Sequence, residues 1–99
     1  KVLPAPGEGP SEQARKQGHF SIELLGKHPS DALKNLRVSV TGDQDPGYGA
    51  TSKMLAEAAV CLAVDNLVAG GGFLTPASAM GDELVRRLQQ KAGMGFKVI

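Results

Sequence analysis

The stretch from His19 to Gly42 reads HFSIELLGKHPSDALKNLRVSVTG, and it decides the fold. Hydrophobic and polar residues alternate in two runs, whose hydrophobic members are Phe20, Ile22 and Leu24, then Leu36, Val38 and Val40. A period of two places successive side chains on opposite faces of a strand, so each run predicts a strand with one buried face. The intervening turn sequence at 26–31 predicts an antiparallel hairpin with a long loop.

A helix is expected after this hairpin, over roughly residues 50–66. Gly, Asp and Pro residues at 42–49 end the second strand, and apolar residues then recur at helical spacing. Every residue from 58 to 64 is apolar. A helix that is apolar around its circumference is covered on several sides, so we expect this helix to be central.

A second helix is predicted to start at Thr75-Pro76, because Thr can cap free backbone amides and Pro needs no hydrogen bond at the first helical position. Its apolar residues follow a 3.6-residue period, and Gly93 is the expected C-terminal cap. The i, i+4 spacing of Asp82 with Arg86, and of Glu83 with Arg87, predicts two ion pairs on the solvent-exposed face.

The last residues, 96–99, predict a short third strand. The order strand, strand, helix, helix, strand predicts an α+β fold, in which two helices pack on one face of a small antiparallel sheet of about three strands. Residues 1–18 begin with a run rich in Pro and Gly and are predicted to be a linker or loop, in which Ser11 can cap a helical turn. Residues 19–99 form the predicted domain.

Composition excludes several classes of protein. The 99 residues carry 11 basic and 10 acidic side chains, a formal net charge of +1, which argues against a nucleic-acid-binding protein. No apolar run approaches the ~20 residues that span a bilayer, so no membrane span is expected. The single cysteine, Cys61, excludes an internal disulfide and a zinc site built on paired cysteines. A reducing, cytoplasmic location is therefore expected.

The glycine-rich segments do not form a nucleotide-binding motif. Residues 42–47 have the glycine spacing of a phosphate-binding loop, but Tyr48 stands where that motif needs lysine. The dinucleotide fingerprint would need glycine in place of Thr75. We therefore expect no cofactor site in this chain. His19 and His28 also lack metal-ligand spacing, so no metal site is expected.

Polar residues at the two helix starts allow more than one interpretation. Asp45 precedes the first predicted helix, Thr51 lies at its start, and Thr75 precedes the second helix. These side chains either cap the helices or help to bind an anion at the free amides. Glu57 allows two interpretations as well, a pair with Lys53 or a buried catalytic carboxylate.

Three blocks of sequence resemble a known family. They are PGEGPS at 6–11, GDQDPGYGATSKMLAE at 42–57 and GGFLTPASAMG at 71–81. Together they resemble the saccharopine-dehydrogenase-like oxidoreductases, in particular the branch of trans-acting enoyl reductases. The resemblance covers nearly the whole chain, but only the C-terminal segment of those enzymes.

This resemblance implies a part of an NAD(P)-dependent oxidoreductase that is inactive alone. In the family, an N-terminal Rossmann domain binds NAD or NADP, and the C-terminal segment contributes to the substrate and dimerisation domain. The implied partners are therefore the missing Rossmann domain and a second copy, paired through sheet edges. No catalytic residue is carried over, and the pocket candidates are Glu8, Asp45, Tyr48, Thr51 and Thr75.

Two non-enzymatic alternatives remain open at this point. The first is an interaction or dimerisation module that joins sheets edge to edge, since a three-stranded sheet has two unpaired edges. The second is a stand-alone carrier of a small ligand, for which only the polar loops argue.

Overall fold

The computed structural model describes residues 5–99, so the first four residues of the predicted linker lie outside the described part. Helix α1 (Glu12–Gln17) begins after Ser11, whose Oγ accepts a hydrogen bond from the Ala14 N–H at 3.2 Å, as expected. The chain here is held to the loop at residues 43–48, because the Asp45 N–H donates to the Arg15 carbonyl at 3.1 Å. The domain boundary after residue 18 stays a prediction.

The sheet has three antiparallel strands in the order β1-β2-β3, formed by β1 (Phe20–Gly26), β2 (Leu36–Gly42) and β3 (Met94–Val98). The predicted hairpin is confirmed, and its loop contains a short 3-10 helix, η1 (Ala32–Lys34). The α+β class and the element order are confirmed as well.

Register gives the sheet one apolar and one polar face. Ile22 pairs with Val40, and Val40 pairs with Phe96, so these side chains share a face. The apolar face is completed by residues of the same alternation (Phe20, Leu24, Leu36, Val38 and Val98). The opposite face carries hydroxyls and charges, including an ion pair between Glu23 and Arg37 at 2.6 Å. Only the apolar face needs a cover.

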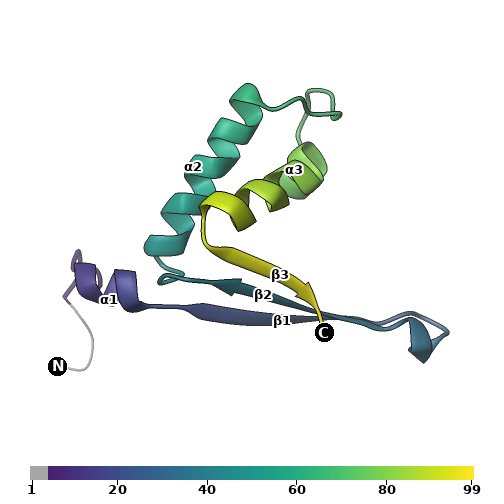
Figure 1. Ribbon diagram of the computed structural model, residues 1–99, viewed down its shortest axis with the longest axis horizontal. Helices are drawn as coiled ribbons and strands as arrows, with labels where there is room; N and C mark the ends of the chain where they lie inside the picture. The colour runs from purple at the N-terminus through teal and green to yellow at the C-terminus, as the bar shows by residue number, and fades with distance from the viewer. Residues whose placement is uncertain (1–4) are drawn as a thin grey trace.

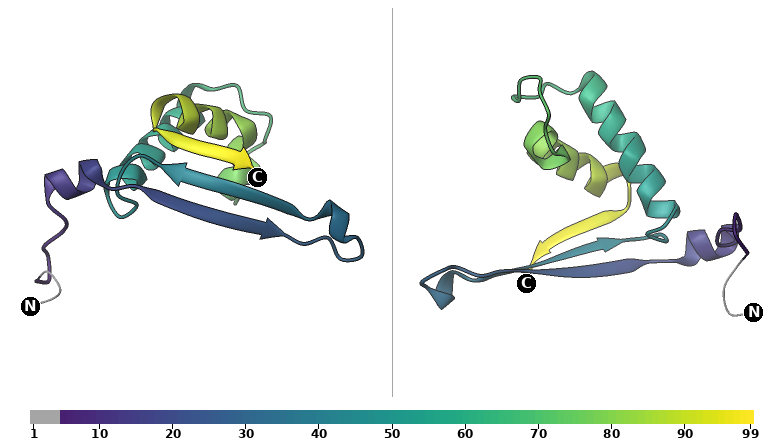
Figure 2. Two further views of the ribbon diagram at one scale, coloured as in Figure 1. Left: turned by 60° about the horizontal axis from the view of Figure 1, so that its bottom comes forward. Right: turned by 180° about the vertical axis from the view of Figure 1, so that it is seen from behind.

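Helices α2 (Gly49–Val64) and α3 (Pro76–Lys91) rise from one end of the sheet (Figure 1). Both further views show the hairpin end extending away from them (Figure 2). The core lies where α3 turns into β3, around Leu88, Ala92 and Met94. Side chains from β1, β2, α2, α3 and β3 pack against it (Phe20, Val40, Met54, Leu84 and Phe96). The helices therefore cover only part of the apolar face.

The prediction that α2 is covered on several sides is wrong for this chain. Cys61 is fully buried against α3, but Leu55, Leu62 and Val64 on other sides of α2 are exposed. A helix that is apolar all round needs neighbours all round. Residues 5–99 supply them on one side only.

The expectation of one continuous second helix also needs correction. Gly81 interrupts α3 with φ +48° and ψ −131°, a conformation that only glycine adopts without strain. The predicted caps are confirmed: Thr75 Oγ1 accepts from the Ser78 N–H at 3.2 Å, and Gly93 follows the helix end with φ +67°.

The molecule is extended for its length. Its radius of gyration is 16.6 Å, whereas a folded domain of this size has about 13 Å. The accessible surface is 7421 Å², about 2,000 Å² more than a folded monomer of this mass exposes. Among the helices of residues 5–99, none has the length and apolar character to cross a membrane.

The kink gives a first prediction. A Cβ at Gly81 would contact nothing within 4 Å, so Gly81→Ala meets backbone strain but no clash. We expect it to lower the free energy of unfolding by about 1–3 kcal/mol in urea denaturation. Gly71→Ala is the control, since Gly71 is equally open but has no positive φ. Equal effects of the two variants would contradict the assignment of the kink to Gly81.

Candidate functional site

The β2–α2 loop is organised by one carboxylate. Asp45 accepts three backbone N–H bonds, from Gly47 at 3.0 Å and from Tyr48 and Gly49 at 2.9 Å each. These bonds hold the pKa of Asp45 below its usual value, because they stabilise the charged form. The amides at the start of α2 are thereby occupied by the chain's own side chain. Of the two interpretations of Asp45, the structure favours the cap.

Three of the other pocket candidates lie around this loop. Thr51 Oγ1 donates to the Pro46 carbonyl at 2.6 Å, which stabilises the turn. The ring of Tyr48 lies beside Gly9, since a Cβ built there would be 3.5 Å from the ring. Glu8, next to Gly9, accepts from the Ala5 N–H at 3.0 Å. The structure therefore brings together Glu8, Asp45, Tyr48 and Thr51.

Glu8, Tyr48 and Thr51 are the exposed members of this group. Tyr48 is 59% exposed, and its hydroxyl has no hydrogen-bond partner among residues 5–99. Glu8 lies in an exposed turn. A phenol can donate or accept a hydrogen bond, and a carboxylate can accept a hydrogen bond or a proton, so each can orient a polar ligand. Asp45 and Thr51 position this loop, Glu8 is bonded within its own turn, and the Tyr48 hydroxyl is left to contact a ligand.

Thr75 lies apart from the other four candidates. It begins α3, beside the end of α2, whereas Tyr48 and Thr51 lie at the start of α2 (Figure 1). The 16 residues of α2 separate the two regions by about 24 Å. A hollow of ≈ 540 Å³ near Thr75 is lined by residues of α2 and the α2–α3 connection, including Leu62, Asp65 and Gly71. None of the five candidates lines it.

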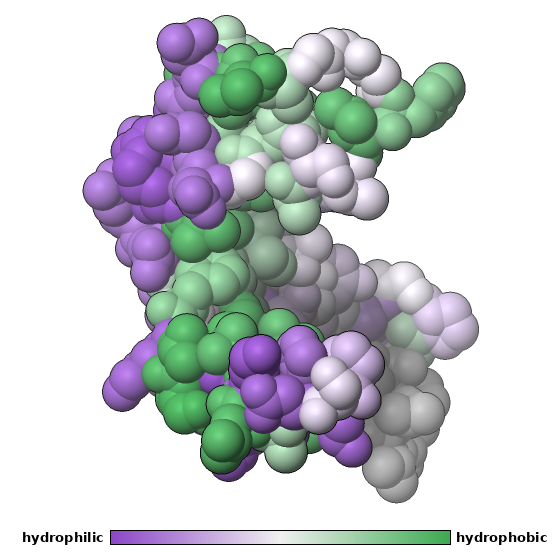
Figure 3. Space-filling view, turned by 90° about the vertical axis from the view of Figure 1, so that its right-hand side faces the viewer, coloured by the Kyte–Doolittle hydropathy of each residue, from purple (hydrophilic) through white to green (hydrophobic). Residues whose placement is uncertain are grey.

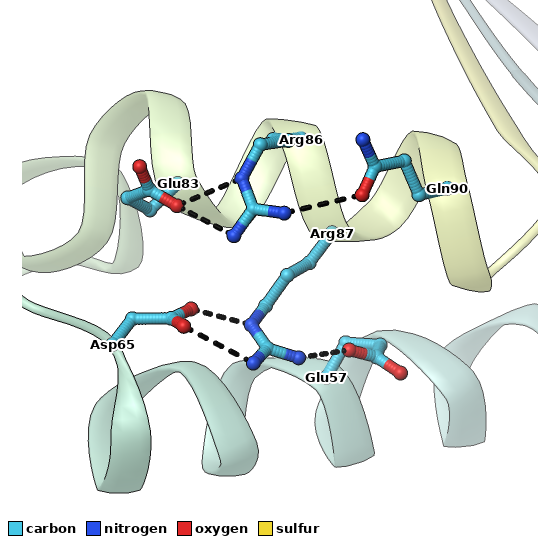
Figure 4. A network of polar contacts seen from close by, with 6 residues as sticks. All are labelled: Glu57, Asp65, Glu83, Arg86, Arg87 and Gln90. Carbon is cyan, nitrogen blue, oxygen red and sulfur yellow. Dashed lines mark hydrogen bonds and ion pairs between the residues drawn. The ribbon is translucent and has the colours of Figure 1, made fainter.

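The most buried polar group of the described residues is Arg87. Its Nε and Nη2 donate to the two carboxylate oxygens of Asp65, and its Nη1 donates to Glu57 Oε2 at 2.9 Å (Figure 4). Arg87 lowers the pKa of Asp65, and the two carboxylates raise the pKa of Arg87. Glu57 and Asp65 belong to α2 and its end, and Arg87 belongs to α3. This network therefore joins the two helices.

The two predicted i, i+4 pairings in α3 are wrong, and so is the pairing of Lys53 with Glu57. Arg87 is 6% exposed and does not pair with Glu83, which bonds Arg86 instead, and Asp82 does not pair with Arg86. Lys53 pairs with Asp43 at 2.9 Å, which leaves Glu57 for Arg87. The sequence did indicate that Arg87 is buried, because Arg87 lies three residues after Leu84 and directly before Leu88, on the apolar side of α3.

Cys61 is structural. It is fully buried, and burial raises the pKa of its thiol, which keeps the sulfur protonated and inert. Within the described part of the chain, no three His, Cys, Asp or Glu side chains gather as a metal site would need. His19 and His28 are both exposed.

Comparison with known proteins identifies relatives of this sequence. A Mycobacterium tuberculosis protein, provisionally named a trans-acting enoyl reductase, is 44% identical over 90 residues. Proteins named trans-acting enoyl reductase from Mycobacterium ulcerans and Mycobacterium bovis are each 37% identical, over 92 and 90 residues. The chain is homologous to one segment of the trans-acting enoyl reductases. No protein-family profile and no solved structure matches it.

The match covers most of this chain but a small part of its relatives. The aligned residues make up 89% of this chain and 21% of the M. tuberculosis protein, so the chain spans about a fifth of that relative's length. The coarse part of the predicted resemblance, to enoyl reductases, is thereby confirmed. The match also agrees with the prediction that this chain corresponds to one part of an oxidoreductase.

The Arg87 network gives a second prediction. Arg87→Leu leaves the carboxylates of Glu57 and Asp65 close together with no cation between them. We expect it to lower the urea midpoint of unfolding by more than twice the shift of Arg86→Leu, since Arg86 is exposed and bonds only Glu83 and Gln90. Equal shifts would show that the network does not join the helices.

Asp45 gives a third prediction, which concerns pH. Because the pKa of Asp45 is lowered in the folded chain, its ionised carboxylate stabilises the fold. This contribution is complete above the pKa of Asp in the unfolded chain, about 3.9, and is lost as pH falls through the pKa of the folded chain. Asp45→Asn should therefore be less stable than the unmodified chain at pH 7, and the difference should shrink below about pH 4 in thermal unfolding. Asp82→Asn, at an exposed position, is the matched control.

Proposed function

We propose that this chain is the C-terminal, substrate-side segment of a saccharopine-dehydrogenase-like oxidoreductase of the trans-acting enoyl reductase type. The observation that carries the enoyl reductase part of the proposal is 44% identity over 90 residues to a protein named a trans-acting enoyl reductase. The saccharopine-dehydrogenase-like part rests on the resemblance of the three sequence blocks. The chain's part would be to shape the substrate pocket and to contribute to a dimer. Hydride transfer would take place elsewhere in the complete protein, so the segment alone would be inactive.

The residues of this chain do not fit a nicotinamide dinucleotide. Such a cofactor binds at a glycine-rich turn between a strand and a helix of a parallel sheet. The sheet of residues 5–99 is antiparallel throughout, and its triple glycine, 70–72, joins one helix to another. NAD or NADP would therefore bind to a Rossmann domain in the rest of the protein, and no step is assigned here to the cofactor.

Tyr48 is the residue that we propose contacts the substrate. Its hydroxyl is exposed, its loop is fixed by Asp45, and Glu8 lies in the adjoining segment. An enoyl group carries a polarised carbonyl, which a phenol can orient by donating a hydrogen bond. Thr75 belongs to a separate region and is proposed to cap α3 only. We also propose a cytoplasmic location, which the single, reduced cysteine supports.

The test uses a chimera in which this chain replaces the matching segment of the M. tuberculosis protein. The chimera should bind NADPH and reduce an enoyl thioester, whereas the 99-residue chain alone should give no saturable change in NADPH fluorescence. Tyr48→Phe in the chimera should lower kcat/KM about tenfold or more with unchanged melting, since it removes one hydroxyl. Thr75→Ser, which keeps the cap, is the control. Micromolar NADPH binding by the chain alone, or full activity of Tyr48→Phe, would contradict the proposal.

A second candidate is a non-enzymatic module that pairs through sheet edges. The observation in its favour is that β1 and β3 each have one edge unpaired within residues 5–99. Sedimentation of the chain at tens of micromolar tests it. A monomer of 10.3 kDa would contradict the module. A dimer would support the module over the first proposal only together with an inactive chimera, because the first proposal also places a dimer contact in this chain.

A further inference from the structure

The apolar face of the sheet continues well beyond the core. Its outer part consists of four side chains, Ile22, Leu24, Leu36 and Val98, which we call the distal patch. Each of them is about half exposed, between 49% and 62%. They lie on the face that packs against the helices at the other end of the sheet. The distal patch is thus the continuation of a core that this chain leaves uncovered.

The exposed surface of the whole chain is large enough to include a stable interface. The chain exposes about 2,000 Å² more than a folded monomer of its mass, while a standard stable interface buries about 800 Å² on each partner. Exposed apolar patches of this kind mark contact sites. The opposite face of the sheet, with its hydroxyls and its Glu23–Arg37 pair, suits water instead.

The shape of the surface favours one occupant. The distal patch belongs to the arm formed by the sheet, and the view from the hairpin end shows hydrophobic residues on both arms of the molecule with a hollow between them (Figure 3). A two-fold contact places the same surface on both partners. The hollow of one copy would therefore face the hollow of the other, and neither would fill it. A convex apolar element, such as a helix, would fill the hollow and complete a helix layer on the sheet.

We propose that the distal patch binds an apolar helix from the other four-fifths of an enoyl reductase of the relatives' length. This inference rests on the proposed function, because it takes the rest of that protein as the partner. The patch is then an internal docking surface between this segment and the larger part. The unpaired edges of the sheet play no part in this contact.

Cysteine labelling tests the proposal with a matched pair. Leu24 and Leu25 are neighbours of one residue type, 53% and 57% exposed, on opposite faces of β1. The natural Cys61 is fully buried and gives a silent background. Leu24→Cys and Leu25→Cys are made in the 99-residue chain and in the chimera, treated with a maleimide at low concentration, and read by peptide mass.

We expect both cysteines to react at similar rates in the chain alone. In the chimera, Leu24→Cys should react at least ~10-fold more slowly, and Leu25→Cys should be unchanged. Equal rates in the chimera would overturn the proposal. Leu24→Cys could also be protected in the chain alone, at concentrations where the chain sediments as a dimer. That result would assign the patch to a second copy and would overturn the proposal too.

A second pair of variants repeats the test, and a second experiment does without the chimera. Val98→Cys on the patch and Lys97→Cys on the opposite face repeat the contrast on β3. If the chimera does not fold, the separately purified remainder of the M. tuberculosis protein is added to the cysteine variants of the chain before the maleimide, and absence of protection then counts against the proposal. The labelling result does not depend on turnover. A protected but inactive chimera would refute the proposed function alone, and an active chimera with a reactive Leu24→Cys would refute the docking surface alone.

Discussion

The packing of Leu88, Ala92 and Met94 at the corner between α3 and β3 is the interaction on which the rest of the structure depends. Gly93, with its positive φ, turns the chain there, so the strand that follows α3 folds back under the helix. Phe20 and Val40 bring the hairpin to the same corner. Because this cluster joins the sheet to the helices, the hairpin end and the far end of α2 extend from it with little support.

The ion pairs of Arg87 form a second, polar connection between the helices. A guanidinium has a rigid, planar set of donors, and here it binds Asp65 with two of them and Glu57 with the third. Breaking such a network leaves carboxylates without a counter-ion, so the network defines how α2 and α3 face each other. The apolar corner holds the elements together, and Arg87 fixes their relative orientation.

The extended shape and the relationship to enoyl reductases have a common physical explanation. The chain spans about a fifth of its M. tuberculosis relative's length and exposes apolar surface on its sheet and on α2, and our proposal assigns this surface to contacts with the rest of a larger protein. The Asp45 loop is internally satisfied and rigid, while the Tyr48 hydroxyl beside it is free. That combination, a fixed loop with one exposed functional group, is how binding sites are commonly built.

The sequence by itself determined the strands, the hairpin, the helix caps and the fold class, because these depend on local periodicity and on local bonds such as those of Ser11 and Thr75. It also led to the enoyl reductase relatives through its loop blocks. Tertiary structure alone decided which charges pair: Arg87 bonds Glu57 and Asp65 across two helices, and no spacing along the chain encodes that contact. It also decided that Thr75 lies apart from Tyr48, and that α2 is covered on one side only. Burial depends on what surrounds a surface, and the amino-acid pattern records only that a surface needs covering.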